Sequence, residues 1–278
     1  MKENKEIYII TGATGGIGRE ISRAVARAGK NVVLACRNEK KALELAKEIT
    51  SETQNKNITF IPLSLDKPES VKAFAARIKE LGVPVKALVN NAGIMCKDYT
   101  TTDDGREMTF AVNYTGTVML SVLIAPLMVK GGHIVFTTSL TRYAYPKAVT
   151  SIDESQEQFA QLRTYSRSKS ALTHFAMYMA HCYTSLNINC ADPGVVDSDM
   201  ITMHRWYDPL ATLFFRPLIR SPRKGAVPAL KCLTLNTSGN IVTYHSVKDV
   251  PYKYIHDSRH GHLMQMTREL LAKYDVSL

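Results

Sequence analysis

The sequence has few features of membrane or secreted proteins. No apolar run approaches the roughly 20 residues that a membrane-spanning helix requires. Residues 1–6 are mostly charged and lack the apolar stretch and small-residue cleavage site of a secretory signal. We therefore expect a cytoplasmic protein without a membrane anchor.

Metal ligands are also scarce. The 5 cysteines are odd in number and form no C-x-x-C pair, which argues against a zinc site or a redox pair. We expect them to be small buried hydrophobic residues in a reducing compartment. Three of the 8 histidines (His256, His260 and His262) cluster near the C-terminus without cysteines or a carboxylate set. An exposed polar loop is expected there, and no metal.

Charge of one sign is not concentrated in any segment. The 35 lysines and arginines outnumber the 25 acidic residues, giving a formal net charge of +10, but they are spread along the chain. A nucleic-acid-binding domain usually carries a clustered basic surface. We therefore expect no nucleic-acid partner, and we attribute the charge to solubility and to attraction for a phosphorylated cofactor. Binding that falls steeply with salt would indicate the nucleic-acid alternative.

Strand and helix patterns alternate along the chain. Strands are expected at 7–10, 31–36, 58–63, 85–89, 133–138 and 187–191, and helices at 17–28, 40–51, 69–81, 107–128 and 165–184. Strands that alternate with helices of this length form βαβ units with right-handed crossovers. The expected fold class is α/β, with a doubly wound parallel sheet (Rossmann fold) in a single domain spanning 1–278.

Two segments, 141–162 and 196–222, lack clear periodicity. The second is rich in methionine and aromatic residues. This composition fits a helix packed on the core, and it also fits a mobile lid over an apolar substrate. We expect a substrate lid at 196–222. The residues behind this expectation are Met200, Met203, Trp206, Phe214 and Phe215.

A glycine-rich turn follows the first expected strand. It reads T-G-A-T-G-G-I-G from Thr11 to Gly18 and stands directly before the first expected helix. Glycines permit a tight turn and a close approach of the backbone, and the helix N-terminus offers free amides to a pyrophosphate. The position of the turn predicts a bound dinucleotide. The expected contacts are Gly12, Thr14, Gly15, Gly16, Ile17 and Gly18.

The end of the second expected strand indicates which dinucleotide binds. An aspartate there would accept hydrogen bonds from the adenosine ribose and favour NAD. The chain instead reads A-C-R-N, and the guanidinium of Arg37 suits the 2′-phosphate of NADP. We expect NADP(H) as the cofactor, in contact with Arg37 and Asn38, with Glu39 as a competing acidic group.

A tyrosine and a lysine are spaced for one face of the last expected helix. Tyr165 and Lys169 are four residues apart, so the phenol and the ammonium stack on that face. A free tyrosine has a pKa of about 10. A fixed cation nearby favours tyrosinate, so the pair can exchange a proton with an alcohol or a carbonyl. Many helices carry such a pair in solvent, and it is the glycine turn that favours catalysis here.

These features occur in the order of the short-chain dehydrogenases/reductases, which the chain resembles over essentially its whole length. The matching text is the glycine turn, N-N-A-G at 90–93, Asn113, Ser139, Tyr165-x-x-x-Lys169 and Pro193-Gly194. The strings L-A-C-R-N, D-G-R-E-M-T-F-A-V-N-Y-T-G and D-P-G-V-V look like the retinol-dehydrogenase-like branch. The gap of 26 residues between serine and tyrosine (165 − 139) is also similar to this branch. The chain departs from it by lacking the N-terminal membrane anchor common there.

The resemblance implies a role for each matching residue. Tyr165 would be the general acid/base, and Lys169 would lower its pKa and hold the nicotinamide ribose. Ser139 would polarise the substrate oxygen, with the two preceding threonines as alternatives. Asn113 would anchor a water that links Lys169 to solvent. The further cofactor contacts that the resemblance implies are Leu65, Asp66, Asn91, Ala92, Gly93, Pro193, Gly194 and Val195.

The sequence as a whole predicts an NADP(H)-dependent oxidoreductase that interconverts a carbonyl and an alcohol. The expected substrate is apolar, such as a steroid, a retinoid-like compound or a lipid ketone or aldehyde, and the expected direction is reduction. A homodimer and a homotetramer are both open. The alternative is a non-catalytic NADP-binding sensor or scaffold on the same fold, which would not need Tyr165. An epimerase-type member would hold NAD permanently.

Overall fold

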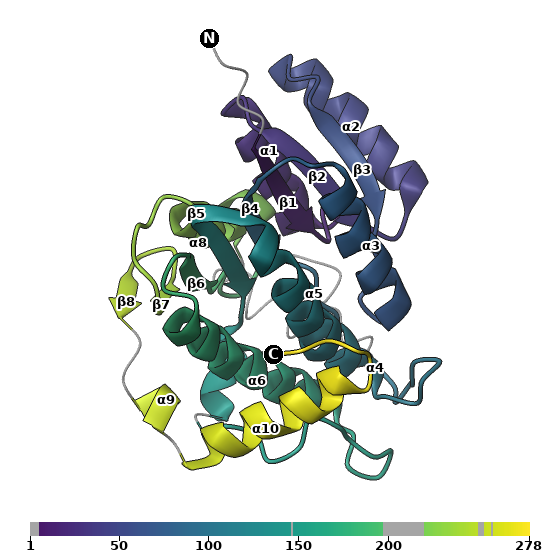
Figure 1. The fold of residues 1–278 in the computed structure, drawn as a ribbon, viewed down its shortest axis with the longest axis vertical. Helices are drawn as coiled ribbons and strands as arrows, with labels where there is room; N and C mark the ends of the chain where they lie inside the picture. The colour runs from purple at the N-terminus through teal and green to yellow at the C-terminus, as the bar shows by residue number, and fades with distance from the viewer. Residues whose placement is uncertain (1–5, 146, 197–219, 250–252, 257) are drawn as a thin grey trace.

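A mostly parallel sheet with helices on both faces organises the chain (Figure 1). The computed structural model describes residues 6–145, 147–196, 220–249, 253–256 and 258–278. The described strands follow the order β3-β2-β1-β4-β5-β6-β7-β8, and only the β7–β8 pair among them is antiparallel. The order reverses between β1 and β4, which makes a topological switch point. The predicted doubly wound sheet in a single domain is confirmed.

Apart from the helix expected at 107–128, the strands and helices of the first 191 residues follow the expected alternation, with shifts of up to five residues at their ends. The strands are β1 (Ile7–Thr11), β2 (Asn31–Cys36), β3 (Ile58–Pro62), β4 (Val85–Asn90), β5 (Met128–Thr137), β6 (Asn187–Ala191), β7 (Asn240–Val242) and β8 (Val247–Asp249). The helices are α1 (Gly16–Arg27), α2 (Glu39–Thr53), α3 (Pro68–Glu80), α4 (Met108–Phe110), α5 (Thr117–Ile124), α6 (Gln161–Cys182), α8 (Pro222–Cys232), α9 (Lys253–His256) and α10 (Ser258–Ala272). Shorter helical segments are the π-helix η1 (Ala111–Gly116) and the 3-10 turns η2 (Ala125–Leu127) and η3 (Leu140–Ala144).

Each face of the sheet buries its own apolar layer. On one face, α1, α2 and α8 cover a cluster that includes Ile10, Ile21 and Leu45. On the other face, α3, α5 and α6 cover a larger cluster that includes Phe74 and Phe175. In Figure 1 the C-terminal helix α10 lies across α6 and lengthens this second layer. The carboxyl ends of the strands are thereby held between two packed layers.

The long helix expected at 107–128 is interrupted, which corrects the prediction. The π-helix η1 separates α4 from α5, and Pro126 lies in η2, where the helix ends. Proline lacks an amide hydrogen and limits helix extension, and Met128 already begins β5. Contrary to the expectation that no apolar run approaches this length, the stretch Met108–Leu127 is long and apolar enough to cross a membrane by length and composition, but 83% of its most apolar window is buried inside the fold. Such burial is also found in core helices.

The three C-terminal histidines lie in helices and not in the predicted loop; His256 and His262 are exposed as expected, but His260 is not. His260 lies in α10 and is only 5% exposed. Its ring centroid is 5.8 Å from that of His174 and 6.2 Å from that of Tyr178, both on α6. Together with Leu263 and Thr267 it belongs to the buried stripe of a helix. The prediction was wrong for His260 because this residue belongs to the helical repeat of buried side chains in α10.

Two other expectations are met only in part. Of the cysteines, Cys36, Cys190 and Cys232 are buried, but Cys182 is exposed. The predicted lid at 196–222 lies, from 197 to 219, outside the residues that the structure describes, so it stays a prediction.

Candidate active site

A groove of about 1000 Å³ opens at the carboxyl ends of the central strands. It lies at the switch point between β1 and β4, where doubly wound sheets bind their ligands. Most of the predicted cofactor contacts line it together. These are Gly12, Thr14, Gly15, Gly16, Ile17, Gly18, Arg37, Asn38, Leu65, Asp66, Asn91, Ala92, Gly93, Tyr165, Lys169 and Pro193. The predicted residues not in its lining are Asn113, Ser139, Gly194 and Val195.

The glycine turn brings the backbone close to the floor of the groove. Gly12 has a φ of +61°, and a Cβ atom there would lie 2.8 Å from the Cα atom of Ala92. A Cβ atom at Gly18 would lie 2.2 Å from the carbonyl oxygen of Gly12. Because Gly15 precedes α1 and carries no side chain, nothing of its own covers the first-turn amides. This arrangement fits a pyrophosphate group.

Basic side chains gather at the end of the groove beside β2. Arg37 is exposed and lines the groove, as do Arg19 and Lys41. The Asn38 side chain accepts a hydrogen bond from the Lys41 amide at 2.9 Å and caps α2. The competing acid, Glu39, is not among the lining residues. The site therefore presents cations where an adenosine 2′-phosphate would lie.

Two polar residues stabilise the walls of the groove. The Ser64 hydroxyl donates to the Asp66 carboxylate at 2.6 Å. The Asn91 side-chain amide donates to the Thr11 carbonyl at 3.0 Å, and its backbone amide donates to the Thr11 hydroxyl at 3.0 Å. Asn91 thus holds the end of β4 against the end of β1.

The Tyr165 phenol lies at the other end of the groove, next to Ser139. Burial raises the pKa of Tyr165 to about 12, a hydrogen bond with the Ser139 side chain opposes this shift, and the charge of Asp192 adds to it. Ser139 is oriented in turn by Thr141, whose backbone amide and hydroxyl donate to the serine oxygen at 3.3 and 3.1 Å. The structure thus brings the predicted acid/base and the predicted polarising hydroxyl together.

Lys169 is buried one helical turn after Tyr165. Its side-chain nitrogen lies 5.8 Å from the centroid of the Tyr165 ring and donates to the Thr137 carbonyl at 2.9 Å. Burial lowers the pKa of Lys169 to about 8. We expected Lys169 to lower the pKa of Tyr165, but the protein groups alone raise it. The difference arises because burial outweighs the other influences on the phenol.

Asn113 is fully buried in the π-helix η1. Its side-chain oxygen accepts from the Ile94 amide at 2.8 Å, and its side-chain nitrogen donates to the Ile94 carbonyl at 2.9 Å and to the Ser168 hydroxyl at 3.0 Å. A Cβ atom at Gly93 would lie 3.1 Å from the Lys169 nitrogen and 3.3 Å from the Asn113 oxygen. Because Gly93 has no side chain, the Lys169 nitrogen and the Asn113 oxygen can both lie close to its Cα atom.

Sequence reasoning missed several residues of the site. Arg19 and Lys41 both line the groove, and each stands within four residues of a predicted contact, a signal that would have identified them. Arg142 and Asp192 form a buried ion pair behind the catalytic residues. No local pattern indicates this pair, because its members are 50 residues apart. In the described part of the chain, no group of three or more His, Cys, Asp or Glu residues is placed to hold a metal ion.

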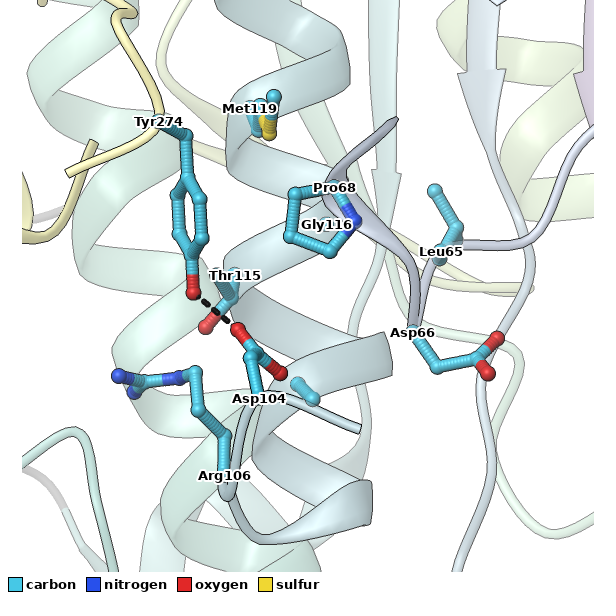
Figure 2. A pocket seen from close by; sticks show the side chains of 10 residues that line it. Leu65, Asp66, Pro68, Asp104, Arg106, Thr115, Gly116, Met119 and Tyr274 are labelled. Atoms are coloured by element: carbon cyan, nitrogen blue, oxygen red, sulfur yellow. Dashed lines mark hydrogen bonds between the residues drawn. The ribbon is translucent and has the colours of Figure 1, made fainter. Parts of the chain in front are cut away.

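A much smaller cavity, of about 10 Å³, lies behind Asp66 (Figure 2). The Tyr274 hydroxyl points into it and donates to the Asp104 carboxylate at 2.5 Å. Burial and the carboxylate raise the pKa of Tyr274 to about 12. On the cofactor side, a Cβ atom at Gly116 would lie 2.0 Å from the Leu65 carbonyl oxygen. This cavity is too small for a ligand and marks where the C-terminal segment packs beside the groove.

Known proteins match the chain over most of its length. A family model described as short chain dehydrogenase matches residues 6–206. Polyprenol dehydrogenase of Mus musculus is 33% identical over 231 residues, which cover 79% of this chain and 69% of that protein. Retinol dehydrogenase 12 of Mus musculus is 31% identical over 230 residues, which cover 82% and 72%. The solved structure of an uncharacterized protein from Mycobacterium paratuberculosis has a TM-score of 0.75 at 23% identity, covering 98% of this chain and 94% of that one.

Proposed function

The chain belongs to the short chain dehydrogenase family, and we propose that it is an NADP(H)-dependent oxidoreductase for an apolar carbonyl or alcohol, with Tyr165 as the general acid/base. The family and its retinol-dehydrogenase-like branch make it an oxidoreductase that acts on CH–OH or C=O groups. The observation that carries the finer proposal is the contact between Tyr165 and Ser139 at the end of the groove.

Proton transfer is assigned to Tyr165. NADP(H), when bound, supplies or accepts the hydride at the carbinol carbon. In reduction, the phenol of Tyr165 donates its proton to the substrate oxygen, and in oxidation it accepts one. Ser139 holds a second hydrogen bond to the same oxygen, on which charge develops in the transition state. Lys169, whose pKa is about 8, changes protonation near neutral pH and is proposed to exchange protons with Tyr165.

The preference for NADP(H) rests on charge. Arg37, Arg19 and Lys41 line the groove near β2, whereas Glu39, the acid closest to the end of β2, does not line it. The acidic residue in the lining, Asp66, follows β3, and Arg19 also pairs with Glu48 at 3.5 Å. A guanidinium binds a phosphate with two parallel hydrogen bonds, and it binds a neutral ribose hydroxyl less strongly. NADPH-linked enzymes of this family usually reduce their substrates, so reduction is the proposed direction.

An apolar substrate is favoured by the surface beside the catalytic residues. Leu140 and Tyr143 follow Ser139 in the chain, Leu162 precedes Tyr165, and Val195 follows Pro193; these four are 46%, 55%, 49% and 41% exposed. None of the four lines the groove, but each stands within four residues of a predicted site residue in the chain. Large exposed apolar side chains often mark a binding surface. The related proteins are named for polyprenol and retinol. We propose a lipid substrate of this kind. The cytoplasmic location and the oligomeric state stay predictions.

The decisive test is a NADPH-oxidation assay over retinal, decanal, geranylgeranial and a 3-ketosteroid. We expect turnover with at least one carbonyl compound, faster with NADPH than with NADH. Tyr165→Phe should lower kcat at least about 100-fold, the usual contribution of a general acid, and leave NADPH affinity within threefold. The matched control is Tyr178→Phe on the same helix, whose hydroxyl accepts from Arg268 at 3.1 Å outside the groove. It should keep kcat within twofold.

Two outcomes would contradict the proposal. Full activity of Tyr165→Phe would mean that another group transfers the proton. Tight NADPH binding without turnover of any compound by the unaltered protein would favour the sensor or scaffold.

A further inference from the structure

A buried ion pair lies behind the catalytic residues, at the carboxyl ends of β5 and β6. Arg142 comes from η3, which follows β5, and Asp192 directly follows β6. The two side chains are each only 1% exposed, and Nη1 of Arg142 bonds directly to Oδ2 of Asp192. Neither residue lines the groove, so the pair does not belong to the binding surface.

The pair connects the two chain segments that form the catalytic end of the groove. Nη1 of Arg142 also donates to the Ser139 carbonyl at 2.6 Å. On the other side, Oδ1 of Asp192 accepts from the Gly194 amide at 3.0 Å. A continuous series of bonds therefore runs from Ser139 through Arg142 and Asp192 to the turn at Pro193 and Gly194.

Between β5 and β6, sheet hydrogen bonds do not continue at this level, although the Asp192 amide still donates to the Val242 carbonyl of β7 at 2.8 Å. The Thr138 amide donates to the Ala191 carbonyl at 2.8 Å, which links the ends of β5 and β6. Immediately afterwards Ser139 begins η3 and Asp192 leads into the turn at Pro193. The distance between these diverging segments is set by side chains, and the Arg142–Asp192 pair spans it.

The energetics favour a functional reason for keeping this pair. Burying two charges costs several kcal/mol per ion, and apolar residues of similar volume often give a protein of equal or greater stability. Burial acts to lower the pKa of Arg142, but Asp192 raises this pKa by a larger amount, so the guanidinium stays charged. A buried charge pair fixes a geometry through directed bonds, whereas apolar contacts allow sliding.

We propose that Arg142 and Asp192 are positioning residues that jointly set the separation between Ser139 and the turn at Pro193 and Gly194. The inference rests on the proposed function, in which Ser139 holds the substrate oxygen and the turn lies on the nicotinamide side. The pair would therefore fix the position of Ser139 relative to the turn that contacts the cofactor.

The first test removes the cation. We expect Arg142→Met to lower kcat at least tenfold with the best carbonyl compound of the panel, after normalisation to the number of NADPH-binding sites. Arg142→Lys should recover at least threefold of that loss, because an ammonium can still bond to Asp192. The losses of Arg142→Met and Ser139→Ala should not multiply in the double variant, since Arg142 acts through Ser139. A kcat within twofold of the parent, or losses that multiply fully, would overturn the proposal.

The second test removes both charges, and it applies even if Arg142→Met does not fold. Arg142→Met combined with Asp192→Leu leaves no unpaired charge, but it also removes the bond to Gly194. We expect the same loss in kcat and, in addition, an NADPH affinity at least fivefold weaker by fluorescence titration. An unchanged NADPH affinity would refute the link to the turn.

A matched control separates positioning from simple loss of stability. Arg23→Met removes a half-buried arginine of α1 that bonds to Glu48 and Glu52 of α2 and does not line the groove. It should lower the melting temperature and leave kcat per NADPH site within twofold. The NADPH affinities do not depend on turnover, so failure of this inference is distinguishable from failure of the proposed function, which is judged by Tyr165→Phe.

Discussion

Lys169→Met should make the protein more stable while it removes activity. Burial lowers the pKa of Lys169 from 10.5 to about 8, a difference of 2.5 (10.5 − 8). Each pKa unit corresponds to about 1.4 kcal/mol. Holding this ammonium charged at pH 7 therefore costs the folded state about 3 kcal/mol. Methionine has a similar shape and no charge, but it loses the hydrogen bond to the Thr137 carbonyl, worth about 1 kcal/mol. The expected net gain is about 2 kcal/mol.

The gain should depend on pH in a defined direction. Between pH 8 and 10.5 the unfolded chain retains a proton on Lys169 that the folded protein has released. The stability of the parent protein therefore rises with pH across this window. Lys169→Met lacks this contribution, so its advantage should shrink by about 3 kcal/mol and end at a small deficit near pH 10.5.

Urea unfolding without cofactor at pH 7, 8, 9 and 10 measures this difference. Lys86→Met is the matched control, because the Lys86 ammonium also donates to a backbone carbonyl, that of Gly131 at 3.1 Å, but is half-buried. It should lose up to about 1 kcal/mol at pH 7. If Lys169→Met is less stable than the parent at pH 7, or if the difference does not change from pH 7 to 10, the reasoning about the buried ammonium is wrong.

Two further substitutions test the adenosine end and the C-terminal contact. Arg37→Ala should raise KM for NADPH about tenfold, as expected for loss of a charged hydrogen bond, while KM for NADH changes less than twofold. The control is Lys40→Ala, because Lys40 is exposed and does not line the groove. Equal effects of Arg37→Ala on both cofactors would refute the phosphate contact. Tyr274→Phe should cost about 1 kcal/mol at pH 7 by urea unfolding, because it removes the bond that helps lower the pKa of Asp104. Because the pKa of Asp104 lies below its usual value in the folded protein, this contribution decreases as pH falls below about 4. A difference that is as large at pH 3 as at pH 7 would contradict it.

The residues predicted to contact the adenosine and the pyrophosphate lie together in the groove, and they could be found from the sequence because their signals are local. Gly12 and Gly18 are required by backbone contacts within one turn, and the turn stands between a strand and a helix that can both be recognised by period. Arg37 follows a strand end directly. Tyr165 and Lys169 share one helix. In each case the residues that act together are close in the sequence.

Long-range features could not be predicted. The Arg142–Asp192 pair joins the ends of two strands, and only the register of β5 against β6 brings its members together. The burial of His260 likewise depends on α10 packing on α6. The direction of the pKa shift of Tyr165 could not be predicted for the same reason. An i, i+4 ammonium suggests a lowered phenol pKa, but the surrounding burial, invisible in the sequence, raises the pKa of Tyr165.

The distribution of burial along the groove separates its two tasks. Arg37 lies at the end of the groove that is proposed to bind the 2′-phosphate, and it is exposed to solvent. Its substitution should therefore alter the affinity for NADPH with little effect on the stability of the fold. At the catalytic end, Lys169 and the Arg142–Asp192 pair are almost completely buried, where charge is costly to the folded state. Stability alone would favour apolar residues there. The cost is concentrated next to the Tyr165–Ser139 contact, and the proposed proton transfer to a substrate oxygen would require both a titratable neighbour and a fixed geometry. Cofactor preference should therefore change readily by substitution, whereas substitutions at the buried end should lower activity even where they stabilise the fold.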